Sequence, residues 1–331
     1  MKPKLLIVEL WGLGDLIIAT SFLRAAQKKF EVTLLAKPYA RDVQPRLWPD
    51  VRVETFVAPW TAFKHKYHFW RWPFLKMIRL RQRLARERFD YGLSARFSRG
   101  GGDPRDNLLL TLIGVKNRLG FSHLGSRMFV TQPVPRPEPT AHRLESWRAM
   151  AKALGLELEP SNTNDECGER KNILIHTGAG QPVRVWPLKH YQTLATFLRR
   201  KQFVVQIACD PDQRDWWLQN GETNVLTPHT VAELVAAVDA AEIFIGNDSG
   251  PGHLAAAGGL PTFTIFGPQL PEWFRPLDAQ AEWIEGKACP YKPCSDYCRF
   301  PAPFCIQDIG VEEVIARVEQ FLSRNTTALI S

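Results

Sequence analysis

The chain has 331 residues, of which 45% are apolar and 23% are charged. These values are typical of a globular protein, and they exclude a disulfide-dense miniature scaffold and a disordered chain. At roughly 150 residues per domain, the length favours two domains. Glu9 and Asp15 interrupt the first apolar run, which is therefore too short for a membrane span. The same two acids, with no small-residue cleavage site after them, make the N-terminus a poor signal peptide. We expect a cytoplasmic protein with no transmembrane segment.

Positive charge is concentrated in the first half of the chain. The net charge is +8, yet residues 1–150 contain 27 Lys and Arg against 12 Asp and Glu, whereas residues 151–331 contain 15 against 22. A basic half indicates an anionic partner, such as an acidic substrate, an acidic lipid surface or nucleic acid. The arginine-rich stretch 79–86 is by itself more typical of a solvated helix.

The N-terminal segment predicts a strand, a turn, a helix and a second strand. Residues 4–10 form an apolar run suited to a buried strand, and residues 12–15 form a glycine-containing turn. A helical pattern covers residues 16–29, and a second apolar run covers residues 32–36. This order predicts a parallel sheet.

The second half repeats the same alternation. It predicts strands at 171–176, 203–208, 243–245 and 263–266, and helices at 191–200, 231–240 and 254–257. Between the halves, the proline-rich stretch 132–139 is expected to be irregular, and a helix is expected over about 141–154. Residues 157–170 are polar and aperiodic, so we place a boundary between Rossmann-like domains at 1–160 and 161–331.

Two doubly wound parallel-sheet domains facing a central cleft are the architecture of one glycosyltransferase class, and the periodicity equally allows a dehydrogenase. The dinucleotide fingerprint G-x-G-x-x-G, however, lacks its last glycine both at 12–17 and at 178–183. This absence disfavours a nucleotide-dependent oxidoreductase. A nucleic-acid binder is the other alternative, but the sequence contains no recognisable binding module.

Asp15 follows the first predicted strand. A carboxylate at the mouth of a phosphate cradle would repel a diphosphate, so the loop of Gly12 and Gly14 is a poor nucleotide site. Asp15 could cap the following helix, or it could act as a general base for an attacking hydroxyl. The two roles are compatible.

The loops in the second half of the chain, unlike the Asp15 loop, are suited to bind an anion. Thr177, Gly178 and Gly180 offer a hydroxyl and backbone N–H groups, and Arg184 adds a charged fork, which would suit a diphosphate. The alternative is a simple turn with a surface arginine. Residues 246–253 follow another strand, where ligands collect in open α/β sheets. There Asp248 could contact sugar hydroxyls or cap the next helix, and His253 could be a packed histidine.

Several motifs point to one family. They are GLGDLIIAT at 12–20, RLGF at 118–121, HTGAG at 176–180, RVWP at 184–187, GNDSGPGHLAAA at 246–257 and FGP at 266–268. In these motifs and their order, the sequence resembles glycosyltransferase family 9, the heptosyltransferases of lipopolysaccharide core synthesis. The resemblance implies a GT-B fold with an N-terminal acceptor domain and a C-terminal domain for an ADP-heptose donor.

The resemblance also implies roles for individual residues. Asp15 matches the catalytic base, beside the acceptor-side glycines Gly12 and Gly14. The donor-site positions are Thr177, Gly178, Gly180, Arg184, His229, Asp248, Ser249, Gly250 and His253. Position 184 departs from the family pattern, which usually has lysine; an arginine fork and a lysine point charge are not interchangeable.

The expected reaction is an inverting displacement that needs no metal cofactor. An acceptor hydroxyl attacks the anomeric carbon while Asp15 takes its proton, and Arg184, Thr177 and backbone N–H groups stabilise the departing ADP. Domain closure would exclude water. The expected partners are an ADP-sugar and an acidic glycolipid at the inner face of the inner membrane, with no nucleic acid. A protein acceptor is the alternative.

Four of the six cysteines form a C-x4-C-x3-C-x6-C cluster at Cys289, Cys294, Cys298 and Cys305. Disulfides are rare in the cytoplasm, whereas four thiolates could hold structural Zn or Fe. The resemblance adds that some relatives bind iron near such cysteines. The alternative is that the thiols are reduced and packed. Cys167 and Cys209 are isolated in the sequence.

Overall fold

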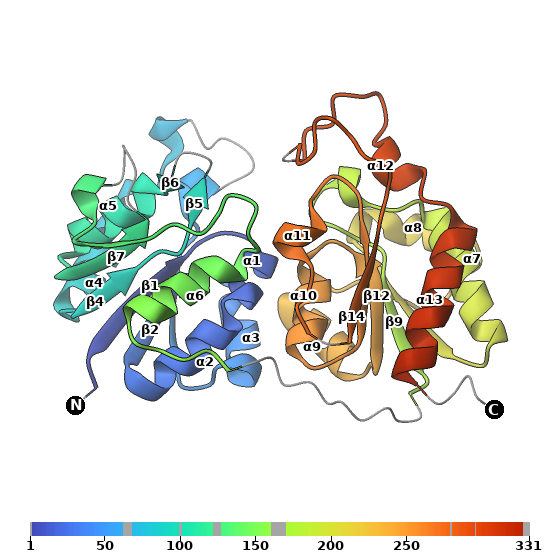
Figure 1. The fold of residues 1–331 in the computed structure, drawn as a ribbon, viewed down its shortest axis with the longest axis horizontal. Coiled ribbons are helices and arrows are strands. Elements are labelled where there is room, and N and C mark those ends of the chain that lie inside the picture. The colour runs from blue at the N-terminus through green and yellow to red at the C-terminus, as the bar shows by residue number, and fades with distance from the viewer. Residues whose placement is uncertain are drawn as a thin grey trace. The chain divides into compact units, whose positions relative to one another are not determined.

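The computed structural model describes residues 2–61, 68–98, 101–121, 127–159, 170–278, 280–294 and 296–326. The chain divides into two compact units, residues 1–160 and 161–331. Each unit contains a six-stranded parallel sheet with helices packed around it (Figure 1). The doubly wound α/β class predicted from the sequence is therefore confirmed. Cys167 lies outside the described residues.

The first unit has the strand order β3-β2-β1-β4-β7-β8. Its sheet strands are β1 (Lys4–Glu9), β2 (Glu31–Ala36), β3 (Arg52–Thr55), β4 (Tyr91–Leu93), β7 (Asn117–Phe121) and β8 (Gln132–Val134), and β5 (Phe97–Ser98) and β6 (Gly101–Gly102) form a small ladder. Its helices are α1 (Leu13–Ile18), α2 (Thr20–Lys29), α3 (Ala40–Leu47), α4 (Phe74–Arg86), α5 (Pro104–Ile113) and α6 (Leu144–Ala153).

The second unit has the order β11-β10-β9-β12-β13-β14. Its strands are β9 (Asn172–His176), β10 (Val204–Ala208), β11 (Val225–Leu226), β12 (Ile243–Asn247), β13 (Thr262–Phe266) and β14 (Ala281–Glu285). Its helices are α7 (Leu188–Arg200), α8 (Arg214–Gln219), α9 (Val231–Asp239), α10 (Gly250–Ala257), α11 (Pro271–Phe274), α12 (Phe304–Gln307) and α13 (Val311–Asn325). A 3₁₀ turn covers Pro182–Arg184.

The two sheets share one topology. In each, the first strand of the unit pairs on one side with the second strand and on the other with a later strand, so the order reverses beside β1 and beside β9. In open α/β sheets, ligands bind beyond the carboxyl ends of the strands at this reversal. The loops after β1, β4, β9 and β12 are therefore the places where a site is expected in each unit.

Three sequence-based boundaries need correction. The proline-rich stretch expected to be irregular contains β8, which pairs with β7 at the sheet edge, where a proline costs few ladder bonds. The helix expected over 16–29 begins earlier and is divided into α1 and α2 at Ala19. The helix expected at 254–257 already begins at Gly250, directly after Ser249.

Apolar side chains explain why these elements assemble. Strand β1 is buried along most of its length, and strands β12 and β13 are buried throughout. This burial matches a parallel sheet covered on both faces. The second unit has a core that includes Trp186, Tyr191 and Phe263. Among the described residues, no helix combines the length and the apolar content needed to cross a membrane.

Candidate active site

Polar side chains gather at the carboxyl edge of the first sheet. Asp15 follows β1, Lys37 follows β2, and Ser94 and Arg96 follow β4. These strands are neighbours in the order β2-β1-β4, so their carboxyl ends bring the side chains together. Asp15, the predicted base, therefore lies at the point where the strand order reverses.

Asp15 has two defined protein partners. Its Oδ1 accepts a hydrogen bond from Nη1 of Arg96 at 3.0 Å, and its Oδ2 accepts from the Gly12 N–H at 3.3 Å. The helix cap position is Gly12, and Asp15 reaches back to it from the third helical residue. Because a carboxylate has about four lone-pair sites, both oxygens can still accept a further hydrogen bond. Its side chain is 26% exposed, which leaves it accessible to a ligand.

Cationic side chains surround this carboxylate. The Arg96 guanidinium stacks 4.0 Å above the Trp11 ring, which orients it toward Asp15. Burial lowers the pKa of Lys37, and the negative charges of Asp15 and Glu9 oppose that shift. Burial also lowers the pKa of Arg143, nearby Arg96 adds to the decrease, and Asp15 opposes it. The positive charge of the first unit is thus concentrated partly at Asp15, where it would attract an anionic ligand.

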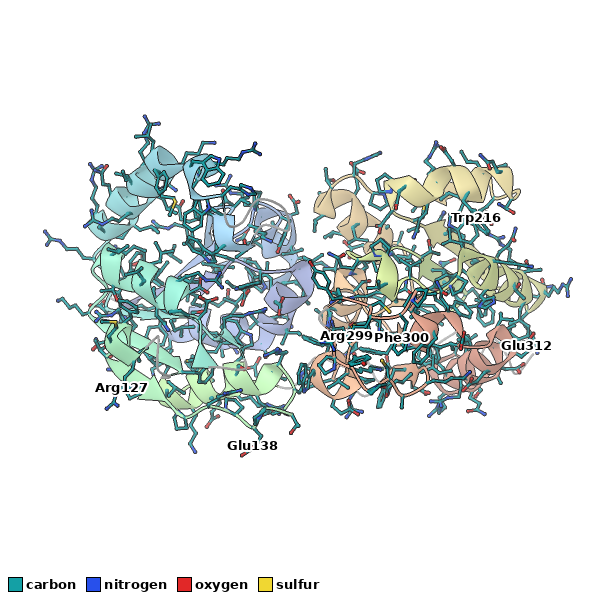
Figure 2. All side chains as sticks on the ribbon, turned by 90° about the horizontal axis from the view of Figure 1, so that it is seen from above. Arg127, Glu138, Trp216, Arg299, Phe300 and Glu312 are labelled. Carbon is teal, nitrogen blue, oxygen red and sulfur yellow. The ribbon has the colours of Figure 1, made fainter. Side chains whose placement is uncertain are left out.

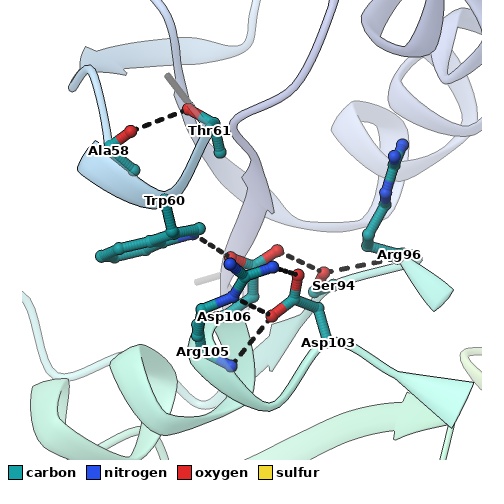
Figure 3. A network of polar contacts seen from close by, with 8 residues as sticks. All are labelled: Ala58, Trp60, Thr61, Ser94, Arg96, Asp103, Arg105 and Asp106. Carbon is teal, nitrogen blue, oxygen red and sulfur yellow. Dashed lines mark hydrogen bonds and ion pairs between the residues drawn. The ribbon is translucent and has the colours of Figure 1, made fainter. Parts of the chain in front are cut away.

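A buried acidic network lies next to this group (Figure 3). Asp106 is fully buried and accepts hydrogen bonds from the Ser94 hydroxyl at 3.1 Å and from the Trp60 indole at 3.3 Å. Burial and the neighbouring Asp103 raise the pKa of Asp106 to about 7. Asp103 in turn pairs with Arg105 at 2.8 Å. These bonds hold the loop after β4 against α5 and thereby position Arg96.

Glu9 should make the first unit less stable as the pH rises. Burial, followed by the charge of Asp15, raises the pKa of Glu9 from 4.5 to about 8. The folded state therefore keeps a proton that the unfolded state releases, and stability decreases between about pH 5 and pH 8. Glu9→Gln should flatten this dependence by up to about 1.4 kcal/mol per pH unit, measured by urea unfolding at several pH values.

The matched control is Glu31→Gln, the same change at an exposed position. It should leave the pH dependence of unfolding as it is in the wild type. Equal slopes for Glu9→Gln and the wild type would show that Glu9 is ionised in both the folded and the unfolded state.

In the second unit, polar side chains also gather at the carboxyl edge of the sheet. The loops after β9, β10 and β12 contribute Gly178, Asp210 and Asp248. A Cβ on Gly178 would lie only 2.2–2.4 Å from the Asp210 carboxyl atoms, so this close approach requires glycine. By contrast, a Cβ on Gly180 would meet nothing within 4 Å. The turn is therefore packed on one side at Gly178 and open at Gly180.

Asn247 holds three segments of this edge together. The side chain is fully buried, and its Oδ1 accepts the backbone N–H of Trp186 at 2.9 Å. Its Nδ2 donates to the carbonyl oxygens of Thr177 at 2.9 Å and Gly178 at 3.3 Å. One amide thus fixes the end of β12 to the turn after β9 and to the segment that carries Arg184.

Arg184 is held between two carboxylates. Its Nε and Nη2 donate to both carboxylate oxygens of Asp296 at 2.6 and 2.8 Å, and its Nη1 lies 3.4 Å from Oδ2 of Asp248. Gln269 also donates to Asp296, at 3.3 Å. The structure therefore brings together Arg184 and Asp248, two of the residues predicted for the donor site, and it adds Asp296 from the cysteine segment.

The remaining predicted donor residues differ in accessibility. The Thr177 hydroxyl is fully buried and donates to Gln213 at 2.8 Å, so its assignment to a diphosphate stays a prediction. Ser249 takes the cap position of α10, ahead of Gly250, so Asp248 is not the helix cap. His253 is buried in α10. His229 is exposed just before α9.

The four clustered cysteines line one pocket in the second unit. Arg299 and Phe300, labelled in Figure 2, also line it. Burial raises the pKa of the Cys305 thiol to about 11, and the thiols of the other three cysteines add to the increase. Among the described residues, however, no three His, Cys, Asp or Glu side chains are arranged to hold a metal ion. Cys209 is buried near Thr227, apart from this pocket.

Sequence reasoning missed three residues of these edges. Arg96 is 81 positions from Asp15, and Asp296 is 112 positions from Arg184. No local pattern connects residues so far apart. Asn247 had a local signal, because it is a polar residue at the end of an apolar strand, and a buried polar side chain needs hydrogen-bond partners.

The sequence is similar to known proteins of one glycosyltransferase family. A family model described as glycosyltransferase family 9 (heptosyltransferase) matches residues 77–301. Lipopolysaccharide heptosyltransferase 3 of Escherichia coli is 28% identical over 194 residues, which cover 55% of this chain and only 53% of that relative.

Solved structures extend the likeness to nearly the whole chain. The family 9 glycosyltransferase of Veillonella parvula DSM 2008 has a TM-score of 0.73 at 18% identity and covers 98% of both chains. The E. coli heptosyltransferase WaaC with ADP has a TM-score of 0.73 at 16% identity, over 96% of this chain and 99% of that one. The fold is therefore the GT-B fold of these proteins.

Proposed function

Because the chain belongs to glycosyltransferase family 9, the heptosyltransferases, we propose that it transfers a heptose from ADP-heptose to an acidic acceptor of the lipopolysaccharide inner core. The observation that carries this proposal is an accessible carboxylate, Asp15, set among cationic side chains at the carboxyl edge of the first sheet. Such a site suits a base that must act on the hydroxyl of an anionic sugar.

In the proposed reaction, Asp15 accepts the proton of the acceptor hydroxyl. The hydroxyl oxygen forms a bond to the anomeric carbon of the donor, and the bond from that carbon to the ADP oxygen breaks, so the configuration inverts. Arg96 and the Gly12 N–H keep the carboxylate oriented for this step. Positioned general bases typically contribute about 10²–10⁴-fold to the rate.

The donor role of the second unit is supported by its charge and geometry. Arg184 can stabilise the negative charge that develops on the departing diphosphate, and Asp248 beside it can accept hydrogen bonds from sugar hydroxyls. WaaC was solved with ADP, and we propose the same nucleotide here. This proposed chemistry assigns no step to a metal ion.

The direct test is mass spectrometry of the products formed from ADP-heptose and a panel of acceptors. We expect one heptose to be added to lipid A–Kdo by the wild-type protein. Transfer to protein acceptors alone would show that the proposed activity is correct but that the acceptor is a protein. No transfer to any acceptor, with nicotinamide oxidation instead, would contradict the proposal and support the oxidoreductase alternative.

The proposed acceptor also implies where in the cell the protein acts. An inner-core acceptor is carried by a lipid at the cytoplasmic face of the inner membrane, so we propose that the protein works there as a peripheral protein. Support comes from the basic first half, because anionic lipids attract Lys and Arg.

A structural Zn or Fe held by Cys289, Cys294, Cys298 and Cys305 is a separate proposal. The four thiols share one pocket, but as arranged they do not form a ligand set. Metal binding would therefore require the segment 289–305 to rearrange, and the ion would have no part in glycosyl transfer. The alternative is reduced, packed thiols.

Metal analysis separates these two alternatives. The metal proposal predicts about one equivalent of zinc or iron in protein purified without chelators, and its loss in the Cys294→Ser/Cys298→Ser variant. Cys209→Ser, which changes a buried cysteine outside the pocket, should retain the metal. Wild-type protein free of metal would establish the reduced thiols.

A further inference from the structure

Helix α4 exposes an apolar stripe that the proposed chemistry does not use. Phe74, Leu75 and Ile78 are 51%, 71% and 50% exposed, and Trp70, just before the helix, is 75% exposed. At 100° per residue, the three helical side chains fall within an arc of about 100°. The helix buries Leu80 and Leu84 on its other side, so packing onto the unit already uses a different face.

Basic side chains flank this stripe. The sequence of α4 contains five Lys and Arg residues and no acid. Arg83 pairs with Glu54 at 2.7 Å, and Arg81 donates to the Leu112 carbonyl oxygen. No described Asp or Glu lies within ion-pair distance of the exposed Lys76, Arg79 or Arg86. Their charge is therefore available to an external anion.

The apolar stripe and the basic side chains of α4 together fit one kind of binding partner. A second copy of the chain would place like charges against one another, and nucleic acid would leave the aliphatic side chains in water. An anionic lipid bilayer satisfies both groups, because aromatic and aliphatic side chains enter the boundary between headgroups and acyl chains while Lys and Arg contact the headgroups. A tryptophan at the end of such a stripe is typical of membrane interfaces.

We propose that α4 and Trp70 form a membrane-docking surface for a bilayer rich in anionic phospholipid. This inference deepens the proposed function, since a lipid-borne acceptor would be reached from such a surface. It places the contact on one helix, and it predicts that membrane binding needs both the apolar stripe and the basic flank.

The test is flotation of the full chain with vesicles. The wild type should float with vesicles of phosphatidylglycerol in phosphatidylcholine, and binding should weaken with pure phosphatidylcholine or with added salt. Leu75→Glu/Ile78→Glu should lower the vesicle partition coefficient at least about 10-fold. The matched control Met128→Glu changes another exposed apolar residue of the same unit and should bind like the wild type.

The outcomes of the flotation experiment can be separated from those of the glycosyl-transfer assay. All variants should melt like the wild type and transfer sugar to a detergent-dispersed acceptor, since they change only exposed side chains outside the active site. Unchanged flotation of Leu75→Glu/Ile78→Glu would overturn the inference, as would equal binding of the wild type to both vesicle types. Loss of a dimer in sedimentation, with no vesicle binding, would identify α4 instead as a contact between copies.

A second inference comes from the Arg184–Asp296 pair. Asp296 belongs to the cysteine segment, and its two carboxylate oxygens accept hydrogen bonds from Nε and Nη2 of the guanidinium. A lysine at this position could not form this fork. We infer that Asp296 is a positioning residue that sets the direction of Arg184 toward the donor diphosphate.

A double-mutant cycle tests this inference, which rests on the proposed ADP-sugar donor. Asp296→Asn should raise KM for ADP-heptose about 10-fold, with a smaller effect on kcat, because Arg184 loses its alignment. Arg184→Lys should raise KM similarly, and adding Asp296→Asn to it should have little further effect. A purely structural role would instead lower the melting temperature with KM unchanged.

Calorimetry with ADP shows whether the role of Asp296 or the proposed ADP-sugar donor is wrong. Equal ADP affinity of the wild type and Asp296→Asn, or a lower KM in the variant, would overturn the positioning role alone. A wild type that does not bind ADP would overturn both this role and the proposed donor.

Discussion

Asp15→Asn should lower kcat for glycosyl transfer by about 10²–10⁴-fold, because the amide cannot take the proton of the attacking hydroxyl. KM for ADP-heptose should change by less than about threefold, since the donor groups lie in the second unit. The fold should persist, because the lost ion pair with Arg96 is partly exposed and worth about 1 kcal/mol or less. Single-turnover transfer and ADP calorimetry measure the two effects separately.

The matched control for this variant is Asp50→Asn, the same change at an exposed position of the same unit. It should transfer sugar at the wild-type rate. If Asp15→Asn retained more than about a tenth of wild-type kcat, another group would have to be the base.

Asn247→Asp should destabilise the second unit by about 3–5 kcal/mol and abolish ADP binding. The change replaces the Nδ2 donor with an oxygen facing the carbonyl oxygens of Thr177 and Gly178, and it buries a charge. Both carbonyl groups lose a donor, and the turn after β9 separates from the end of β12. Urea unfolding and calorimetry with ADP provide the measurements.

The same variant should be partly rescued by acid. Once the new carboxyl is protonated, its O–H can donate to one of the two carbonyl oxygens, so the loss of stability should shrink as the pH falls. Asn224→Asp is the matched control, because it makes the same change at an exposed position. Wild-type stability and ADP affinity in Asn247→Asp would show that the amide does not hold these segments together.

Local patterns identified much of this architecture. Apolar runs marked β1, β9, β12 and β13, because a strand buried on both faces must be apolar along its length. The loops that contain Asp15, Arg184 and Asp248 followed from their place after such strands. The family resemblance then supplied roles that spacing alone left open, since Asp15 was compatible with a cap and with a base.

Other features depended on strand order and packing. The proline-rich stretch forms β8 only because β7 offers it an edge partner. The stripe on α4 is exposed because the helix packs through Leu80 and Leu84, a choice that its sequence pattern does not determine. In the same way, the raised pKa of Glu9 depends on burial by the rest of the unit.

The sequence by itself therefore determined the first strands and helices of each unit, their alternation and the loops that could bear chemistry, because hydrophobic periodicity and turn residues act over a few positions. Only the tertiary structure decided which loops meet. Asp15 contacts Arg96, Thr177 contacts Asn247, and Arg184 contacts Asp296 across 81, 70 and 112 positions of chain. The physical reason is that parallel strands adjacent in a sheet need not be adjacent in sequence, so their carboxyl ends bring together residues that no local pattern relates.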